Sequence, residues 1–406
     1  MEIVTITEAR RRLRGALSSS QKEIETVSPE TAVGRITAKD MTAAHPYPPY
    51  RKSPFDGYAI CSHEQKTYDV VATIGAGIVY DGRILPGQAV RLMTGCAVPD
   101  DCDTVIPQEY TIRQNNRIEV TESISPGSNV IPIGEECQEG AVIIPKGTKL
   151  TAGAVSAAVG MGNVTFPVFA KTKILFLTSG RELVLPRSAS TRRADLQLQC
   201  LPLPPHYWKR KAQPSPSIMC LMRRNASTTE TEKVRALSRD ADLIVSTGGV
   251  SVGLYDTMPQ IYERIGSVQL YNRITMRPGS ASYGGVIQRD KGKQTIVLGL
   301  SGNPSAAFNA FELLALPIVR QLNGEQNSDF PIVTCRLSHA IHKENPVDRF
   351  VQGHISFEDG KAVFTPNTTL TSSALLGLSR VNALGCIKKG TPPLPEGAPI
   401  TAILLF

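Results

Sequence analysis

Three apolar segments that each end in a glycine-containing loop constrain most strongly what this chain can fold into. They are "KTKILFLTSG", "ADLIVSTGGVSVG" and "QTIVLGLSGNP", and helical patterns such as "TETEKVRALSRD" and "DTMPQIYERIG" alternate with them. Continuous apolar strands alternating with helices are typical of a doubly wound parallel sheet that is covered on both faces. Ligands bind to such sheets outside the carboxyl ends of the strands. The pattern therefore predicts an α/β domain whose ligand crevice is formed by these loops.

The composition of the loops indicates an anionic ligand. Glycines let backbone N–H groups approach a ligand closely, and the start of a helix favours negative charge. Loops converging from one sheet would suit a phosphorylated molecule. The alternative is that each loop is only a tight turn between a strand and a helix, because a single glycine-rich turn is weak evidence.

The segments on either side of the α/β region have a different pattern. Short apolar runs alternate with Gly, Pro, Asn and Asp turns over residues 68–145 and again after residue 326, which predicts β-rich modules. We expect an elongated N-terminal domain over residues 1–45 and 140–170, a barrel-like β-rich domain over 46–139, the α/β domain over 171–325 and a C-terminal β-rich domain over 326–406. Thr5 and Glu8 lie at capping-box spacing and predict the start of a first helix.

Two loops in the N-terminal half contain further candidates. Asp56 in "SPFDGYA" is either a turn-forming residue or a functional acid, and "MTGCAVP", with Thr94 and Gly95, is either a strand-ending turn or a phosphate-contacting loop. Taken alone, the residues favour the turn in both cases.

The composition indicates a cytoplasmic protein. Hydrophobic residues make up 41% of the chain, no apolar run approaches the ~20 residues of a membrane helix, and the N-terminus lacks the features of a signal peptide. Eight cysteines without a CxxC pair favour reduced thiols over disulfides or a zinc site. No membrane partner is expected.

The net charge of +8 is concentrated in one place. Between Pro186 and Asn225 the chain has eight basic residues and one acid, Asp195, so this segment alone has a net charge of +7. A nucleic-acid-binding protein that uses this segment is one alternative. The rest of the chain has a net charge of only about +1, and no aromatic-basic platform accompanies the segment, so no nucleic-acid partner is expected.

Seven motifs occur in a specific order: "SPFDGYA", "MTGCAVP", "NVIPIGEE", "TSGREL", "STGGVSVG" followed by Asp256, "RPG" and "GLSGNP". This set resembles the MoeA/gephyrin-type molybdopterin molybdenumtransferases over nearly the whole chain. The resemblance implies a homodimer of four-domain subunits that takes adenylylated molybdopterin and molybdate, releases AMP and yields molybdenum cofactor with a divalent cation, usually Mg²⁺. It also implies a molybdopterin adenylyltransferase and molybdoenzyme maturation proteins as partners.

The resemblance also implies roles for individual residues. Those expected to act on the reacting groups are Asp56, Glu182, Asp256 and Arg277, with Arg277 holding the molybdate dianion. Those expected to bind the metal are Asp56, Glu182 and Glu136. Those expected to hold phosphate and pterin are Thr94, Gly95, Ser246, Gly248, Gly249, Ser251, Ser301, Gly302, Asn303 and Pro304.

Departures from the family pattern qualify the expected activity. Arg181 stands where the family has Asp or Asn, and Ser280 stands where a second Lys is usual. The motif "NVIPIGEE" lacks the family's arginines and ends in Glu136 rather than Asp. The lost cations predict weaker molybdate binding. An inactive or scaffold-like relative, which binds molybdopterin or partner enzymes without turnover, is the alternative.

The basic segment also lacks a family motif. The family has "QIYNSN" where this chain has "ADLQLQC", residues 194–200. These residues can be encoded GCA GAT CTA CAA CTC CAA TGC, and reading one nucleotide later gives Gln-Ile-Tyr-Asn-Ser-Asn. We hypothesise that residues 186–228 are translated out of frame.

Overall fold

The computed structural model describes residues 3–17, 22–179, 217–222, 228–250, 257–342 and 344–405. They fall into two compact units. The first unit comprises Met1–Glu25, Gly34–Ile36 and Phe169–Phe406, and the second comprises Thr26–Val33 and Thr37–Val168.

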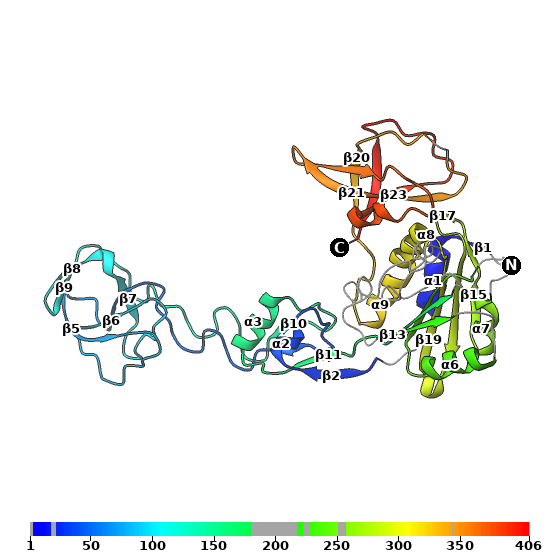
Figure 1. The fold of residues 1–406 in the computed structure, drawn as a ribbon. Helices are drawn as coiled ribbons and strands as arrows, with labels where there is room; N and C mark the ends of the chain where they lie inside the picture. The colour runs from blue at the N-terminus through cyan, green and yellow to red at the C-terminus, as the bar shows by residue number, and fades with distance from the viewer. Residues whose placement is uncertain are drawn as a thin grey trace, which may run out of the picture. The chain divides into compact units, whose positions relative to one another are not determined.

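A six-stranded sheet forms the centre of the first unit (Figure 1). Its strands, in the order β13-β12-β14-β19-β18-β15, are Ser217–Met222, Ile174–Ser179, Leu243–Thr247, Gln294–Leu300, Ser282–Gln288 and Val268–Tyr271. The first four run parallel, as the apolar segments predicted. Strand β18 runs antiparallel to both of its neighbours, and a short turn at residues 289–293 joins it to β19 as a hairpin. The predicted doubly wound α/β fold is confirmed, and its sheet is mixed rather than wholly parallel.

The two faces of this sheet bury alternate residues of each strand. In β12, Ile174 and Phe176 pack into the core cluster of α1 and the helices after β19, whereas Leu175 and Leu177 pack with α6 and α7. This alternation follows from the two-residue period of a strand. The helices are α1 (Ile6–Ala16), α6 (Thr228–Ser238), α7 (Met258–Arg264), α8 (Pro304–Ala310) and α9 (Leu316–Leu322).

Helix α1 begins where the sequence predicted. The Thr5 hydroxyl accepts a hydrogen bond from the Glu8 N–H at 3.2 Å, while the Glu8 carboxylate pairs with Arg11 and Arg12. These two guanidinium groups lower the pKa of Glu8 to about 2. Parallel pairing of β1 (Ile3–Val4) with β16 (Arg273–Ile274) also attaches the N-terminus to this unit.

The helical segment after β19 contains a π-helical turn, Phe311–Ala315, between α8 and α9. Pro317 lacks the N–H that an α-helix would donate to the Leu313 carbonyl. Arg10 of α1 donates to this carbonyl instead, from Nε at 2.7 Å.

The C-terminal strands form a second sheet in the same unit. They are β17 (Met276–Arg277), β20 (Ile332–Leu337), β21 (Asp348–Glu358), β22 (Lys361–Pro366), β23 (Ala383–Ile387) and β24 (Pro399–Leu404). The pairing runs β21-β22-β20-β24-β23 and returns to β21, so these five strands close on themselves. Phe350 and Leu384 of this sheet belong to the same core cluster as α8 and α9.

The second unit is built mainly from β-strands, as predicted for this half of the chain. A six-stranded sheet of order β7-β4-β6-β5-β9-β8 comprises Thr104–Pro107, Gly57–Ile60, Gln88–Leu92, Thr67–Ile74, Arg117–Val120 and Thr111–Gln114. The remaining elements are β2 (Ile24–Val27), α2 (Pro29–Ala32), β3 (Met41–Thr42), β10 (Val142–Ile144), α3 (Ala152–Gly160) and β11 (Phe166–Phe169).

Short 3₁₀ turns lie at Gln108–Tyr110 in the second unit and at Asp290–Gly292 and Leu376–Arg380 in the first. None of the helices in the described part of the chain has the length and apolar character needed to cross a membrane.

Candidate active site

The carboxyl ends of β12, β14 and β19 converge in the first unit. The Gly248 N–H donates to the Leu300 carbonyl at 3.1 Å, and a Cβ atom added to Gly302 would lie 3.3 Å from the Gly248 Cα. Gly248 has a φ of +80°, and a Cβ there would lie 2.5 Å from the Ser179 carbonyl oxygen at the end of β12. These loops therefore approach each other through backbone atoms, which only glycine allows at Gly248.

Ser246 has a role different from the expected contact with a ligand. Its side chain is fully buried, and its hydroxyl bonds to the Tyr262 hydroxyl inside the core beneath α7. Tyr262 in turn stacks on Tyr283, with ring centroids 4.5 Å apart. Burial raises the pKa of Tyr262, so its phenol stays neutral. The hydroxyl of Ser246 supports the end of β14 from inside rather than facing a ligand.

The loop after β19 is on the surface of the unit. Gly302 and Asn303 are exposed and Ser301 is half-buried, while Pro304 is buried at the start of α8. The Ser301 hydroxyl accepts a hydrogen bond from the Asn303 N–H at 3.2 Å. This geometry leaves Gly302 and Asn303 accessible to a ligand beside the Gly248–Gly249 turn.

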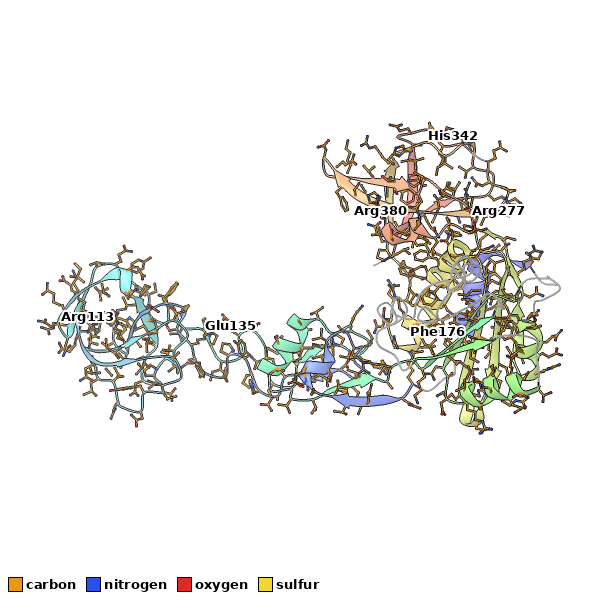
Figure 2. All side chains as sticks on the ribbon, viewed as in Figure 1. Arg113, Glu135, Phe176, Arg277, His342 and Arg380 are labelled. Carbon is orange, nitrogen blue, oxygen red and sulfur yellow. The ribbon has the colours of Figure 1, made fainter. Side chains whose placement is uncertain are left out.

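Two arginines are paired where the α/β and C-terminal sheets of this unit meet (Figure 2 labels Arg277). Arg277 of β17 lies opposite Arg349 of β21 in a parallel register. Burial, and then the nearby Arg277 guanidinium, lower the pKa of Arg349. Arg349 Nη1 donates to Asn345 Oδ1 at 3.4 Å. Like charges placed opposite each other on neighbouring strands are unfavourable unless an anion lies between them.

The Arg277 turn is packed against the start of α8. Gly279 has a φ of +108°, and a Cβ there would lie 3.1 Å from the Ala306 carbonyl oxygen. The arginine pair and the Ser301–Asn303 loop are thus attached to the same helix.

In the second unit, Asp56 is joined to the "MTGCAVP" loop. Its Oδ1 accepts hydrogen bonds from the Thr94 N–H at 2.6 Å and the Thr94 hydroxyl at 2.8 Å. These bonds, the backbone one first, lower the pKa of Asp56. Thr94 is exposed and Gly95 has a φ of +86°, so the loop presents both groups at the surface. Glu136 is exposed in the same unit, and no described interaction links it to Asp56.

Several predicted residues lie outside the described part of the chain. They are Glu182, Ser251, Asp256 and, apart from residues 217–222 and Thr228, the segment 186–228. Within the described part, no group of three or more His, Cys, Asp or Glu side chains is arranged to hold a metal ion.

Comparison with known proteins connects both units to one family. Family models match in chain order: "MoeA N-terminal region (domain I and II)" over residues 4–162, "Probable molybdopterin binding domain" over 224–321 and "MoeA C-terminal region (domain IV)" over 334–405. The curated molybdopterin molybdenumtransferase of Bacillus subtilis is 30% identical over 408 residues, which cover 95% of this chain and 90% of that protein. The Staphylococcus epidermidis protein of that name is 28% identical over 396 residues, covering 92% and 90%. The crystal structure of the molybdopterin biosynthesis MoeA protein from Pyrococcus horikoshii OT3 has the same fold, with a TM-score of 0.81 over 99% of this chain and 100% of that chain at 22% identity.

The fold and these matches place the chain in a class of proteins that combine an α/β molybdopterin-binding domain with β-rich domains. Within this class, the chain belongs to the MoeA family of molybdopterin molybdenumtransferases. Its place is therefore in molybdenum cofactor biosynthesis.

Some candidate residues were not found from the sequence. Arg349 was missed because only the pairing of β17 with β21 places it opposite Arg277. Asn309 and Gln352, whose side chains bond to each other at 2.7 Å, were missed because neither lies in a recognisable motif. No local sequence signal could have identified them.

Proposed function

We propose that this chain is a molybdopterin molybdenumtransferase that inserts molybdate into adenylylated molybdopterin and releases AMP. The observation that carries the proposal is the extent of the similarity, which covers 95% of this chain and 90% of the Bacillus subtilis relative. The glycine-rich strand ends support it, because they place the exposed backbone of Gly302 and Asn303 beside the Gly248–Gly249 turn, where a phosphorylated pterin can approach closely. The scaffold-like alternative is less well supported, because the relatives are named as transferases.

A molybdate site beside Arg277 and Arg349 would complete this activity. Two guanidinium groups in register offer several N–H donors to a tetrahedral dianion. Arg349 would supply the second positive charge that Ser280 does not. Molybdate would thus neutralise a repulsion that exists in its absence.

Mg²⁺ is proposed to bind at Asp56. The residues fit a hard cation, because the Thr94 hydrogen bonds keep Asp56 ionised and use Oδ1, which leaves Oδ2 for coordination. Mg²⁺ usually takes one or two protein carboxylates together with substrate phosphates, so a cage of acids is not required. When bound, the ion would polarise the phosphoanhydride of the substrate.

The remaining expectations from the resemblance are also proposals. We propose a homodimer in the cytoplasm, in which Glu182, Asp256 and Glu136 act on the metal and the pterin. A molybdopterin adenylyltransferase would deliver the substrate, and molybdoenzyme maturation proteins would receive the product.

The test is AMP release by the purified full-length chain. Adenylylated molybdopterin and Mg²⁺ are supplied with and without molybdate, and AMP is measured by chromatography. We expect release that requires molybdate, and R277Q to reduce it about tenfold or more at limiting molybdate, the effect of one lost charge-assisted contact. R113Q, an exposed arginine of the second unit, is the matched control and should leave the rate unchanged. Wild-type protein that binds the substrate without molybdate-dependent release would contradict the proposal.

A further inference from the structure

Helix α8 and strand β21 are joined by a buried network of amide side chains. Gln352 Nε2 donates to the Ser305 carbonyl at 3.0 Å and to Asn309 Oδ1 at 2.7 Å. Asn309 Nδ2 donates to the Phe350 carbonyl at 2.8 Å. Asn309 is fully buried and Gln352 is 5% exposed, so each bond is shielded from water. Both N–H groups of the Gln352 amide are used.

The network fills a gap in the pairing of β21. On one side, this strand pairs with β17 at Asp348–Arg349 and with β22 only from Gly353 onward. The Phe350 carbonyl accepts from Asn309, and the Gln352 carbonyl accepts from the Asn367 N–H at 2.8 Å. Buried backbone groups need such partners, which makes α8 part of the edge of the C-terminal sheet.

A second contact holds the beginning of the same helix. The Ser305 N–H donates to the Ser372 carbonyl at 3.1 Å, and Asn303 Nδ2 lies 3.5 Å from the Ser372 hydroxyl. The C-terminal domain therefore contacts both the N–H and the carbonyl of Ser305, immediately after Gly302-Asn303-Pro304. The position of this exposed loop is set from outside the α/β domain.

We infer that Gln352 and Asn309 are positioning residues, through which the C-terminal domain holds the Gly302–Pro304 loop in the geometry that binds molybdopterin. Neither side chain reaches the surface where a ligand would lie, so neither is a catalytic residue. This inference rests on the proposed function, because it assigns molybdopterin to that loop. It also gives the C-terminal domain a defined task in the α/β site.

Gln352→Leu is the variant that tests the inference most directly. Leucine fills a similar volume and removes both donors. Asn382→Leu is the matched control, because the Asn382 side chain makes an equivalent pair of bonds, to the N–H and carbonyl of Ile355 at 2.7 and 3.1 Å, within the C-terminal sheet alone. Both variants remove two amide bonds from this domain, and only Q352L removes bonds that connect the domain to α8. If Q352L does not fold, Q352M makes the same comparison with an unbranched side chain.

Hydrogen exchange in the ligand-free full-length chain is the first measurement. We expect Q352L to accelerate exchange of the amides over residues 301–309, whereas N382L leaves them unchanged and accelerates exchange near Ile355. Equal protection of residues 301–309 in wild type and Q352L would overturn the inference. This outcome does not depend on the proposed function.

Molybdopterin binding by calorimetry is the second measurement. We expect Q352L to raise the Kd about tenfold, because a loop that is no longer held in its binding geometry must be ordered when the ligand binds, and N382L to leave the Kd within about twofold of wild type. A merely structural defect would lower the amount of binding-competent protein and leave the Kd unchanged. An unchanged Kd in Q352L would overturn the inference, whereas a wild-type chain that does not bind molybdopterin would overturn the proposed function.

Discussion

Asp56 is the residue at which local structure and proposed chemistry are most closely connected. Two hydrogen bonds from Thr94 favour its ionised form and lower its pKa. Because the folded-state pKa is depressed, the bonds stabilise the fold above the ordinary pKa of an aspartate. This contribution is lost as the pH falls through the lowered pKa. A cation site at Asp56 should therefore remain charged into mildly acidic solution.

Asp56→Asn should abolish Mg²⁺-dependent AMP release while leaving the fold intact. The amide keeps the shape and can still accept from Thr94, but it offers the cation no charge. Asp69→Asn is the control, because Asp69 is an exposed carboxylate of β5 in the same unit, and its ion pair among the described residues is with Arg117 at 3.2 Å. Single-turnover AMP release compares the two, and equal activity of D56N and wild type would remove Asp56 from the metal site.

Comparing Gly248→Ala with Gly266→Ala distinguishes the cost of backbone strain from the cost of a steric clash between the converging loops. Both glycines have positive φ, +80° and +87°, but an added Cβ meets the Ser179 carbonyl at Gly248 and nothing within 4 Å at Gly266. We expect G266A to cost about 1–2 kcal/mol of unfolding free energy through strain alone. G248A should cost more and should also weaken molybdopterin binding. Denaturant unfolding measures the loss of unfolding free energy, and calorimetry measures molybdopterin binding. If G248A and G266A lose equal unfolding free energy and equal binding affinity, the loops do not converge at Gly248.

Residue identities predicted this site only in part. Gly248 and Gly302 were recognisable because turns that need positive φ or close backbone approach favour glycine. The buried bond of Ser246 to Tyr262 was not predictable, because their partnership depends on how α7 packs against β14. Arg349 is a similar case, since strand register brings it opposite Arg277.

At the scale of elements, the π-helical turn depends on a contact with the N-terminal helix. Pro317 removes an α-helical donor to the Leu313 carbonyl, and Arg10 of α1 supplies one from a distant part of the chain. The apolar pattern of residues 304–322 is typical of a helix, but the irregular turn in this helix follows from Pro317 together with the position of Arg10. Hydrophobic periodicity contains no information about where Arg10 lies relative to the Leu313 carbonyl.

Arg10→Met should lower the free energy of unfolding by about 1–3 kcal/mol, because a charged donor to a buried carbonyl is lost while the apolar stem is kept. Arg11→Met is the control, since Arg11 is 74% exposed and, among the described residues, its side-chain bonds go to Glu8 in its own helix. We expect R11M to change stability by no more than about 0.5 kcal/mol. Urea unfolding followed by circular dichroism distinguishes them, and an R10M midpoint equal to that of R11M would show that Arg10 does not support the turn.

At the scale of the whole molecule, the family models leave residues 163–223 unmatched, a range that contains most of the segment 186–228. The molybdopterin-binding family model matches only from residue 224, although the α/β sheet already begins with β12 at Ile174. This gap is expected if the segment is translated out of frame. The four-domain division predicted from the sequence stays a prediction, because the described residues separate into two units.

The coding DNA between residues 180 and 235 tests this hypothesis. We expect a one-nucleotide shift to restore Gln-Ile-Tyr-Asn-Ser-Asn at residues 194–200, with a compensating shift before "TETEKVRAL". DNA that yields this motif in no frame would refute the hypothesis. The basic segment would then need another explanation.

We propose that this chain transfers molybdenum to a pterin at the expense of the adenylyl group of the pterin. The most direct test measures AMP release and pterin-bound molybdenum in the same single-turnover reaction, by chromatography and elemental mass spectrometry. We predict that the two appear together in equal amounts, and that neither appears without molybdate. AMP release without molybdenum on the pterin, or no AMP release from protein that binds the substrate, would contradict the claim.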